Sequence, residues 1–226
     1  MSDDLTAIDI LMLPDATMIE RSRVLNTQMR QSVPDGFRLD AHHRPHITLL
    51  QRYVRTSELT RVFAAVAETI SSADPDALQL RGVRVAHMQV TSQAGVGLAA
   101  LVVEPSQAVL DLQRSLIAAV APFAEQGGTA AAYVTTAQAP EINADTVEYV
   151  ERYVPDHSGD NFVAHVTVGL AQLDFLADLE SRTFDAFTFH PAGFAVFQLG
   201  NNGTAQRELK TWDFSPKGKT PRGRQS

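Results

Sequence analysis

Apolar residues along this chain follow two spacings, and stretches of the two kinds alternate. Spacings of three and four residues place side chains on one face of a helix, whereas short β-branched and apolar runs are typical of strands. The predicted helices cover residues 17–32, 57–73, 105–124, 144–153 and 172–181. The predicted strands cover residues 8–13, 46–54, 78–88, 96–103, 131–135, 165–169, 194–199 and 204–212. Helices and strands interleave but consecutive strands also occur, so the order favours an α+β fold with antiparallel sheets.

One four-residue pattern occurs twice. His46-Ile47-Thr48-Leu49 lies in the first half of the chain and His165-Val166-Thr167-Val168 in the second. Because side chains alternate between the two faces of a strand, each His and the Thr two residues later share one face, and the apolar residues point into the core. The sequence therefore predicts, on each of two strands, an imidazole beside a hydroxyl, about 6–7 Å apart at Cα.

The paired motif resembles that of the two-histidine (2H) phosphoesterase superfamily, which includes the 2′-5′ RNA ligase-like proteins and the 2′,3′-cyclic phosphodiesterases. In that family each half of the chain carries one His-x-Thr/Ser-x motif. The resemblance implies a bilobal, pseudo-two-fold arrangement of two antiparallel sheets, with helices on the outside and both motifs facing a central cleft. On this basis we expect one domain over residues 1–214. The basic residues 215–226, rich in Gly and Pro, are predicted to form a disordered tail.

Two histidines that flank one phosphate can divide acid–base work. Imidazole has an unperturbed pKa near ~6.5, so one neutral ring can take a proton from water while a protonated ring gives a proton to the leaving ribose oxygen. We therefore predict His46 and His165 as the catalytic pair. Thr48 and Thr167 are the predicted phosphate ligands, because their hydroxyls can donate hydrogen bonds to the non-bridging oxygens. This chemistry requires neither a metal nor another cofactor.

Three further residues are candidate cleft contacts: His43, Arg52 and Arg207. His43 lies in the polar loop before the first motif. Members of the family commonly carry a Tyr in the last hairpin; this chain has none there, and Arg207 is a candidate substitute. Arg52 belongs to a basic stretch, residues 38–55, which can be read either as a solvated rim or as a positive mouth beside the first motif.

The local charge around each motif suggests which histidine is the base. His46 follows Arg44, and nearby positive charge lowers the pKa of an imidazole. His165 follows Asp156 and Asp160, whose carboxylates would favour the protonated ring if they lie close. This argument predicts His46 as the base toward water and His165 as the acid.

Composition and net charge limit the kinds of molecule that this protein is expected to bind. With 44% apolar and 20% charged residues the chain is an ordinary globular protein, and the absence of cysteine excludes disulfides and thiol chemistry. A net charge of −7 argues against binding along a long nucleic acid, but it allows RNA ends or small cyclic nucleotides as substrates. No apolar run reaches transmembrane length, and the acidic N-terminus lacks the basic region of a signal peptide. We therefore expect a cytoplasmic monomer that does not bind membranes.

Two other classes of function fit parts of the sequence. A module of the same fold could bind nucleotides or RNA ends without turning them over, although binding alone does not require two proton-transfer groups. A histidine-ligated metal hydrolase is the other alternative, because His42, His43 and His46 lie close in sequence. Pro45 interrupts that cluster and no predicted helix aligns it, which argues against zinc.

Overall fold

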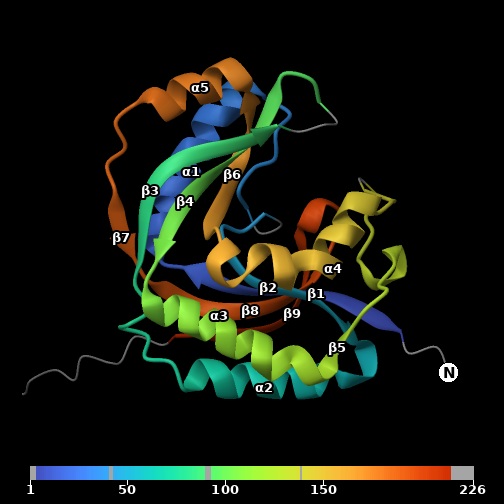
Figure 1. Cartoon of the computed structure of the whole chain (residues 1–226). Coiled ribbons are helices and arrows are strands. Elements are labelled where there is room, and N and C mark those ends of the chain that lie inside the picture. The colour runs from blue at the N-terminus through green and yellow to red at the C-terminus, as the bar shows by residue number, and fades with distance from the viewer. Residues whose placement is uncertain (1–3, 41–42, 90–92, 138, 215–226) are drawn as a thin grey trace, which may run out of the picture.

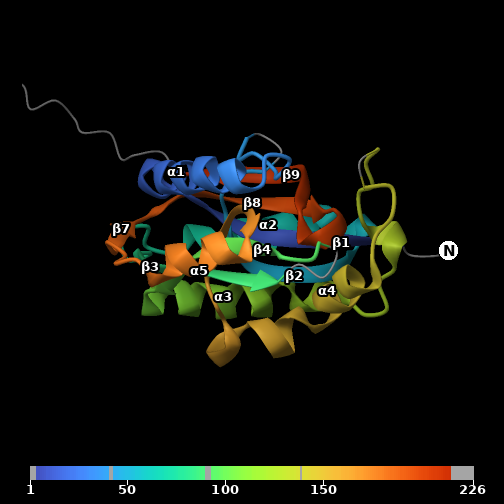
Figure 2. The same ribbon diagram turned by 90° about the horizontal axis from the view of Figure 1, so that it is seen from above.

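The computed structural model describes residues 4–40, 43–89, 93–137 and 139–214. Its strands are β1 (Leu5–Pro14), β2 (Ile47–Arg55), β3 (Leu80–Gln89), β4 (Val96–Pro105), β5 (Ala124–Glu125), β6 (His165–Gln172), β7 (Phe187–Phe189), β8 (Pro191–Leu199) and β9 (Ala205–Asp213). Its helices are α1 (Ala16–Ser32), α2 (Leu59–Ser71), α3 (Gln107–Val120), α4 (Ala144–His157) and α5 (Leu173–Ser181). The strands form two antiparallel sheets with helices around them, which confirms the predicted α+β class (Figures 1 and 2).

The two sheets repeat one order of strands. The first sheet runs β5-β2-β1-β8-β9 and the second runs β6-β4-β3-β7. In each, the motif strand (β2 or β6) pairs with the strand that precedes a long helix, β1 before α1 and β4 before α3. The motif strands of the two sheets contact each other. This correspondence is the pseudo-two-fold, bilobal arrangement that the resemblance implied.

Each motif strand carries a β-bulge three residues after its histidine. Between β1 and β2 the register passes from Ile10 opposite Leu50 to Leu11 opposite Thr48, so Leu49 has no opposite residue. Between β4 and β6 it skips Val168 in the same way. A bulge leaves its extra residue unpaired in the ladder. Leu49 and Val168 are both fully buried, so their backbone carbonyls need another partner.

Two buried amide side chains supply that partner, and each reaches across to the other sheet. Gln113 of α3 donates from Nε2 to the carbonyl oxygen of Leu49 at 3.1 Å. Asn26 of α1 donates from Nδ2 to the carbonyl oxygen of Val168 at 2.8 Å. We call Asn26 and Gln113 the clamp amides. Through them α1 is tied to β6, and α3 is tied to β2.

The clamp amides also hold the segment that leads into each motif. Asn26 accepts from the backbone N–H of Leu39 at 3.2 Å and donates to the carbonyl of Phe37 at 3.0 Å. Gln113 accepts from the backbone N–H of Gly159 at 3.2 Å. Each amide therefore joins the bulge of one motif strand to the segment that enters the other.

The structure corrects the sequence-based elements in three places. Helix α4, predicted to cover residues 144–153, continues through Pro155 to His157. Residues 131–135, predicted as a strand, include instead a short 3₁₀ turn at Ala130–Ala132. The edge strands β5 and β7 were not predicted, because two or three residues are too few to show a period. The predicted tail, residues 215–226, lies outside the described residues. In the described part of the chain, no helix is both long and apolar enough to span a membrane.

The clamp amides give the first testable prediction. Asn26→Ala leaves the buried carbonyl of Val168 and its two other backbone partners without a hydrogen bond, so we expect the free energy of unfolding to fall by about 3 kcal/mol. Gln113→Ala should act in the same direction. Gln31→Ala, on an exposed position of α1, is the control and should stay within about 0.5 kcal/mol. Urea unfolding measures all three, and equal stability of Asn26→Ala and Gln31→Ala would contradict the clamp.

Candidate active site

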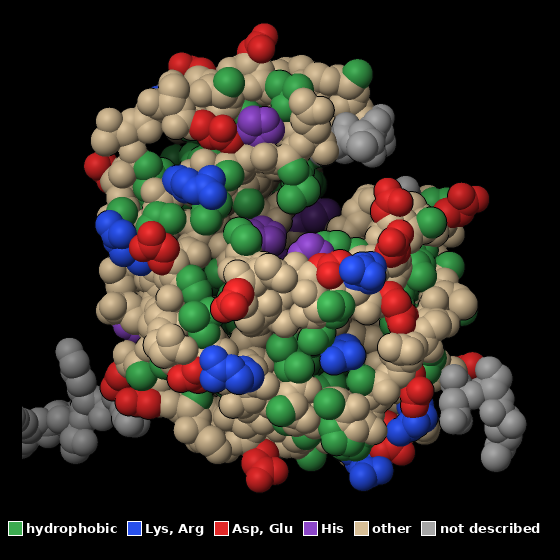
Figure 3. All heavy atoms as spheres, in the orientation of Figure 1, with side chains coloured by type: hydrophobic (Ala, Val, Ile, Leu, Met, Phe, Trp, Pro, Cys, Tyr) green, Lys and Arg blue, Asp and Glu red, His purple; other side chains and the backbone are tan. Residues whose placement is uncertain are grey.

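The two motif histidines stand at the start of the two contacting strands. His46 directly precedes β2, and His165 is the first residue of β6. Their side chains and those of the two motif threonines are partly exposed, whereas the intervening apolar residues are fully buried, so the alternation predicted from the sequence is present in both strands. Figure 3 shows histidine side chains gathered in a hollow of the molecular surface.

Both imidazoles are held in the same way. The Nδ1 atom of His46 lies 2.7 Å from the carbonyl oxygen of Arg44, and that of His165 lies 2.8 Å from the carbonyl oxygen of Val163. A carbonyl only accepts, so Nδ1 must carry the hydrogen in both rings. Nε2 is then the nitrogen of each ring that is left to exchange a proton with a substrate.

The electrostatics of His165 differ from the sequence-based expectation. Burial lowers the pKa of His165, the charges of His46 and His157 lower it further, and the hydrogen bond to the Val163 carbonyl acts in the opposite direction. Asp156, expected to favour the protonated ring, instead binds Arg152 through two hydrogen bonds of 2.6 and 3.0 Å. The predicted direction for His165 was therefore wrong. The charge of His46 acts on His165, in agreement with the contact between the two motif strands.

The two motif threonines have different surroundings. The hydroxyl of Thr48 donates to Oδ2 of Asp9 in β1 at 3.0 Å, and Nε2 of Gln51 donates to the same oxygen at 3.2 Å. Thr167 makes no side-chain hydrogen bond within the described residues. Asp9 is fully buried and was missed by the sequence analysis. An acidic residue in the middle of an apolar strand was the signal that could have identified it.

Helix α4 carries a cluster of three aromatic rings that contacts the first motif through Tyr153. Tyr149 and His157 are stacked with their centroids 4.3 Å apart, and Tyr153 lies edge-on to Tyr149. The hydroxyl of Tyr153 donates to the carbonyl of Thr48 at 3.4 Å. Burial raises the pKa of Tyr149 and of Tyr153, and the charge of Asp9 raises both further, which places this face of α4 beside Asp9.

The three candidate cleft contacts lie in different environments. The ring of His43 stacks on Phe37 with centroids 4.9 Å apart. Burial lowers the pKa of Arg52, and the charge of Glu151 in α4 acts against this. Arg207 of β9 donates to the side-chain oxygen of Gln198 in the neighbouring strand β8.

Two arginines of the basic stretch 38–55 have acidic partners. Arg44 pairs with Glu208 at 3.0 Å, and Arg55 pairs with Glu125. Two of the four arginines in residues 38–55 therefore have their charge balanced by a carboxylate. This favours the interpretation of the stretch as a solvated rim over that of a positively charged mouth.

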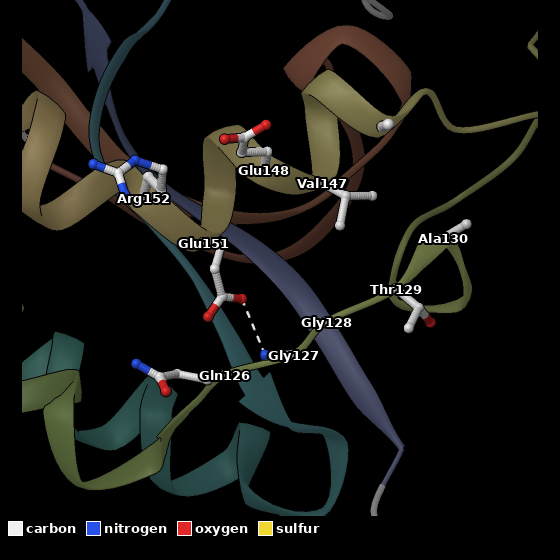
Figure 4. A pocket seen from close by; sticks show the side chains of 10 residues that line it. Gln126, Gly127, Gly128, Thr129, Ala130, Val147, Glu148, Glu151 and Arg152 are labelled. Atoms are coloured by element: carbon white, nitrogen blue, oxygen red, sulfur yellow. Dashed lines mark hydrogen bonds between the residues drawn. The ribbon is translucent and has the colours of Figure 1, made fainter.

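A second hollow lies on the other side of α4. It is lined by residues 126–130 and by residues of α4, and the backbone N–H of Gly127 donates there to Glu151 at 3.1 Å (Figure 4). None of the predicted site residues lines it. In the part of the chain that the structure describes, no group of three or more His, Asp or Glu side chains is placed to hold a metal. His42, part of the zinc alternative, lies outside the described residues.

Comparison with known proteins identifies the family. The sequence model of the 2′-5′ RNA ligase superfamily matches residues 19–200, and the chain belongs to this superfamily, as the paired motif indicated. No curated protein matches the chain significantly. The fold is similar to E. coli LigT complexed with ATP, at 13% identity over 94% of this chain and 99% of that chain, with a TM-score of 0.47. It is also similar to Kluyveromyces marxianus Usb1 with uridine monophosphate, at 13% identity, 95% and 100% coverage and a TM-score of 0.46.

The environment of His165 gives a prediction that needs no substrate. In an NMR titration, the pKa of His165 should lie below the ordinary ~6.5 of an exposed imidazole, since burial and the charges of His46 and His157 disfavour its protonated form. His46→Gln should raise the midpoint of His165 but leave it below the ordinary value, because burial is the largest cause. His87→Gln is the control, as His87 binds Glu180 elsewhere. A midpoint at or above 6.5 in the unmodified protein would refute this description.

Proposed function

We propose that this protein is a metal-independent phosphoesterase that opens 2′,3′-cyclic phosphates, or makes and breaks 2′-5′ phosphodiesters, at RNA or nucleotide ends. The observation that carries the proposal is the pair of identically held histidines, one from each half of the chain, with Nδ1 of both rings bonded to the carbonyl two residues earlier. With Nδ1 of each ring bonded, Nε2 is the ring atom left for proton transfer, and acid–base catalysis by two imidazoles requires such an atom on each. Membership of the 2′-5′ RNA ligase superfamily supports the same class of reaction.

The proposed reaction uses the two rings in opposite protonation states. One neutral Nε2 takes a proton from the attacking water as the oxygen bonds to phosphorus. The other ring gives its Nε2 proton to the ribose oxygen as the phosphorus–oxygen bond breaks, so the cyclic phosphate becomes a monoester and a hydroxyl. When a ribose hydroxyl replaces water as the nucleophile, the same two proton transfers form a 2′-5′ diester.

The surroundings of the histidines support His165 as the base and His46 as the acid in hydrolysis. The lowered pKa of His165 favours the neutral ring, which can accept a proton. This assignment leaves the acid role to His46, and it reverses the one drawn from neighbouring charges in the sequence. Thr48 and Thr167 are proposed to donate to the non-bridging oxygens, where negative charge increases in the transition state.

The charge of the protein supports small nucleotides or RNA ends as substrates. A net charge of −7 and arginines paired with carboxylates leave little attraction for a long phosphate backbone. We further propose that residues 1–214 act as one domain, because the clamp amides join the two sheets. His43, Arg52 and Arg207 stay candidates for substrate contacts.

The first test is turnover of 2′,3′-cyclic AMP with EDTA present. We expect hydrolysis, and we expect His46→Ala and His165→Ala each to lower the rate by about 10²–10⁴-fold while the far-UV circular dichroism is unchanged. Thr48→Val and Thr167→Val should lower the rate less, because each removes one hydrogen bond to a charged group and so raises the activation free energy by about 1.5–3 kcal/mol. Activity that EDTA abolishes would favour the metal hydrolase, and binding without turnover would favour the non-catalytic module.

The assignment of acid and base has a separate test. A 4-nitrophenyl phosphodiester has a good leaving group that departs without a proton, so it does not need the acid. His46→Ala should therefore lose much less activity on this substrate than on 2′,3′-cyclic AMP, whereas His165→Ala should lose similar factors on both. If instead His165→Ala is the variant that the activated substrate rescues, the two roles are exchanged.

A further inference from the structure

Asp9 is a carboxyl group in an unusual position. It is fully buried in the middle of β1, opposite Gln51 of β2 on one side and Phe197 of β8 on the other. A buried carboxylate is normally paired with a cation or well supplied with hydrogen-bond donors. Among the ion pairs of the described residues, none includes Asp9.

The cluster around Asp9 is short of hydrogen-bond donors. Oδ2 of Asp9 receives both the hydroxyl of Thr48 and the amide of Gln51. Oδ1 of Asp9 and Oε1 of Gln51 are buried, and no donor in the described part of the chain reaches either of them. Unpaired buried acceptors are costly. One added proton on Asp9 would turn an acceptor of this cluster into a donor and remove a buried charge.

The titratable groups that face Asp9 come from two elements. His46 stands at the start of β2, and Tyr149 and Tyr153 lie on α4. Burial raises the pKa of Asp9, while the charge of His46 and the hydrogen bonds from Thr48 and Gln51 lower it and do not cancel the effect of burial. The neutral form of the carboxyl is thus favoured relative to an exposed aspartate.

We propose that Asp9 holds a proton when substrate is bound and is the positioning residue that turns the Thr48 hydroxyl toward the phosphate. A hydroxyl has one hydrogen to donate. When Asp9 is ionised, the Thr48 hydroxyl donates its hydrogen to Oδ2 of Asp9. Only the lone pairs of that hydroxyl then remain to face an anionic phosphate. When Oδ2 carries a proton, Asp9 donates to Thr48, and the hydrogen of Thr48 is free to be donated to a non-bridging oxygen. This inference rests on the proposed function for the identity of the ligand.

The two threonines are then inequivalent. Thr48 can serve as a donor to phosphate only while Asp9 is protonated, so its contribution depends on pH. Thr167 has no such partner within the described residues and should contribute at any pH. A cyclic phosphodiester keeps a single negative charge across the neutral and alkaline range, so a change of its affinity with pH reports groups of the protein. Thr167 is therefore the matched control for Thr48.

The first arm of the test measures stability and needs no ligand. If the folded state keeps a proton on Asp9 that the unfolded chain has released, stability falls as pH rises from about 4 toward the folded pKa. Asp9→Asn cannot ionise and can donate to both Thr48 and Gln51 Oε1 once the Gln51 amide turns over. The difference in unfolding free energy between Asp9→Asn and the unmodified protein should therefore grow in favour of Asn as pH rises. Asp185→Asn, at an exposed position, should show a constant difference. A constant difference for Asp9→Asn as well would overturn the inference.

The second arm measures the affinity for 2′,3′-cyclic AMP. The affinity is taken from KM if the nucleotide is turned over and from Kd if it is not. At neutral pH, the affinity of Asp9→Asn should be within a few-fold of that of the unmodified protein. When the pH is raised into the alkaline range, the affinity of Asp9→Asn should fall less than that of the unmodified protein. Asp9→Ala should bind several-fold more weakly. Thr48→Val should lower the affinity less in the Asp9→Ala background than in the unmodified protein, whereas Thr167→Val should lower it equally in both. Weak binding by Asp9→Asn equal to that of Asp9→Ala would show that the ionised carboxylate is required and would overturn the inference. Absence of turnover with both arms as expected would refute the proposed function only.

Discussion

The exchange of clamp amides between the two sheets is the constraint on which the geometry of this site depends. Each motif strand is bulged three residues after its histidine, and each bulge exposes a buried carbonyl that its own sheet cannot pair. Asn26 and Gln113 satisfy these carbonyls from helices that follow a strand of the other sheet. Because an unpaired buried carbonyl is costly, the two sheets are most stable when the motif strands lie side by side.

The site built on this frame is symmetric in its backbone and asymmetric in its charges. Both histidines are held through Nδ1 by the carbonyl two residues earlier. Around them, however, the buried carboxyl of Asp9 lies on the side of His46, and the ring of His157 acts on His165. The lowered pKa of His165 therefore follows from burial and from neighbours that the duplication does not repeat.

Much of the frame could be predicted from the sequence, and the reasons are local. The alternation of His and Thr with buried apolar residues in β2 and β6 is a property of four consecutive residues, so it was visible without the fold. The helices with a strong apolar face, α2 and α3, were predicted for the same reason. The continuation of α4 through Pro155 was missed, because a proline removes a backbone donor and usually ends or kinks a helix.

The sequence by itself determined the class of the fold, the family and the two motif strands, since each of these is encoded in short-range spacing. Tertiary structure alone decided which residues meet across the sheets: Asn26 with Val168, Thr48 with Asp9, and Arg44 with Glu208. It also decided the electrostatics of His165, where the expected partner Asp156 was already bound to Arg152 and burial dominated. Burial and Coulomb interactions depend on distance in space, and distance along the chain does not report it.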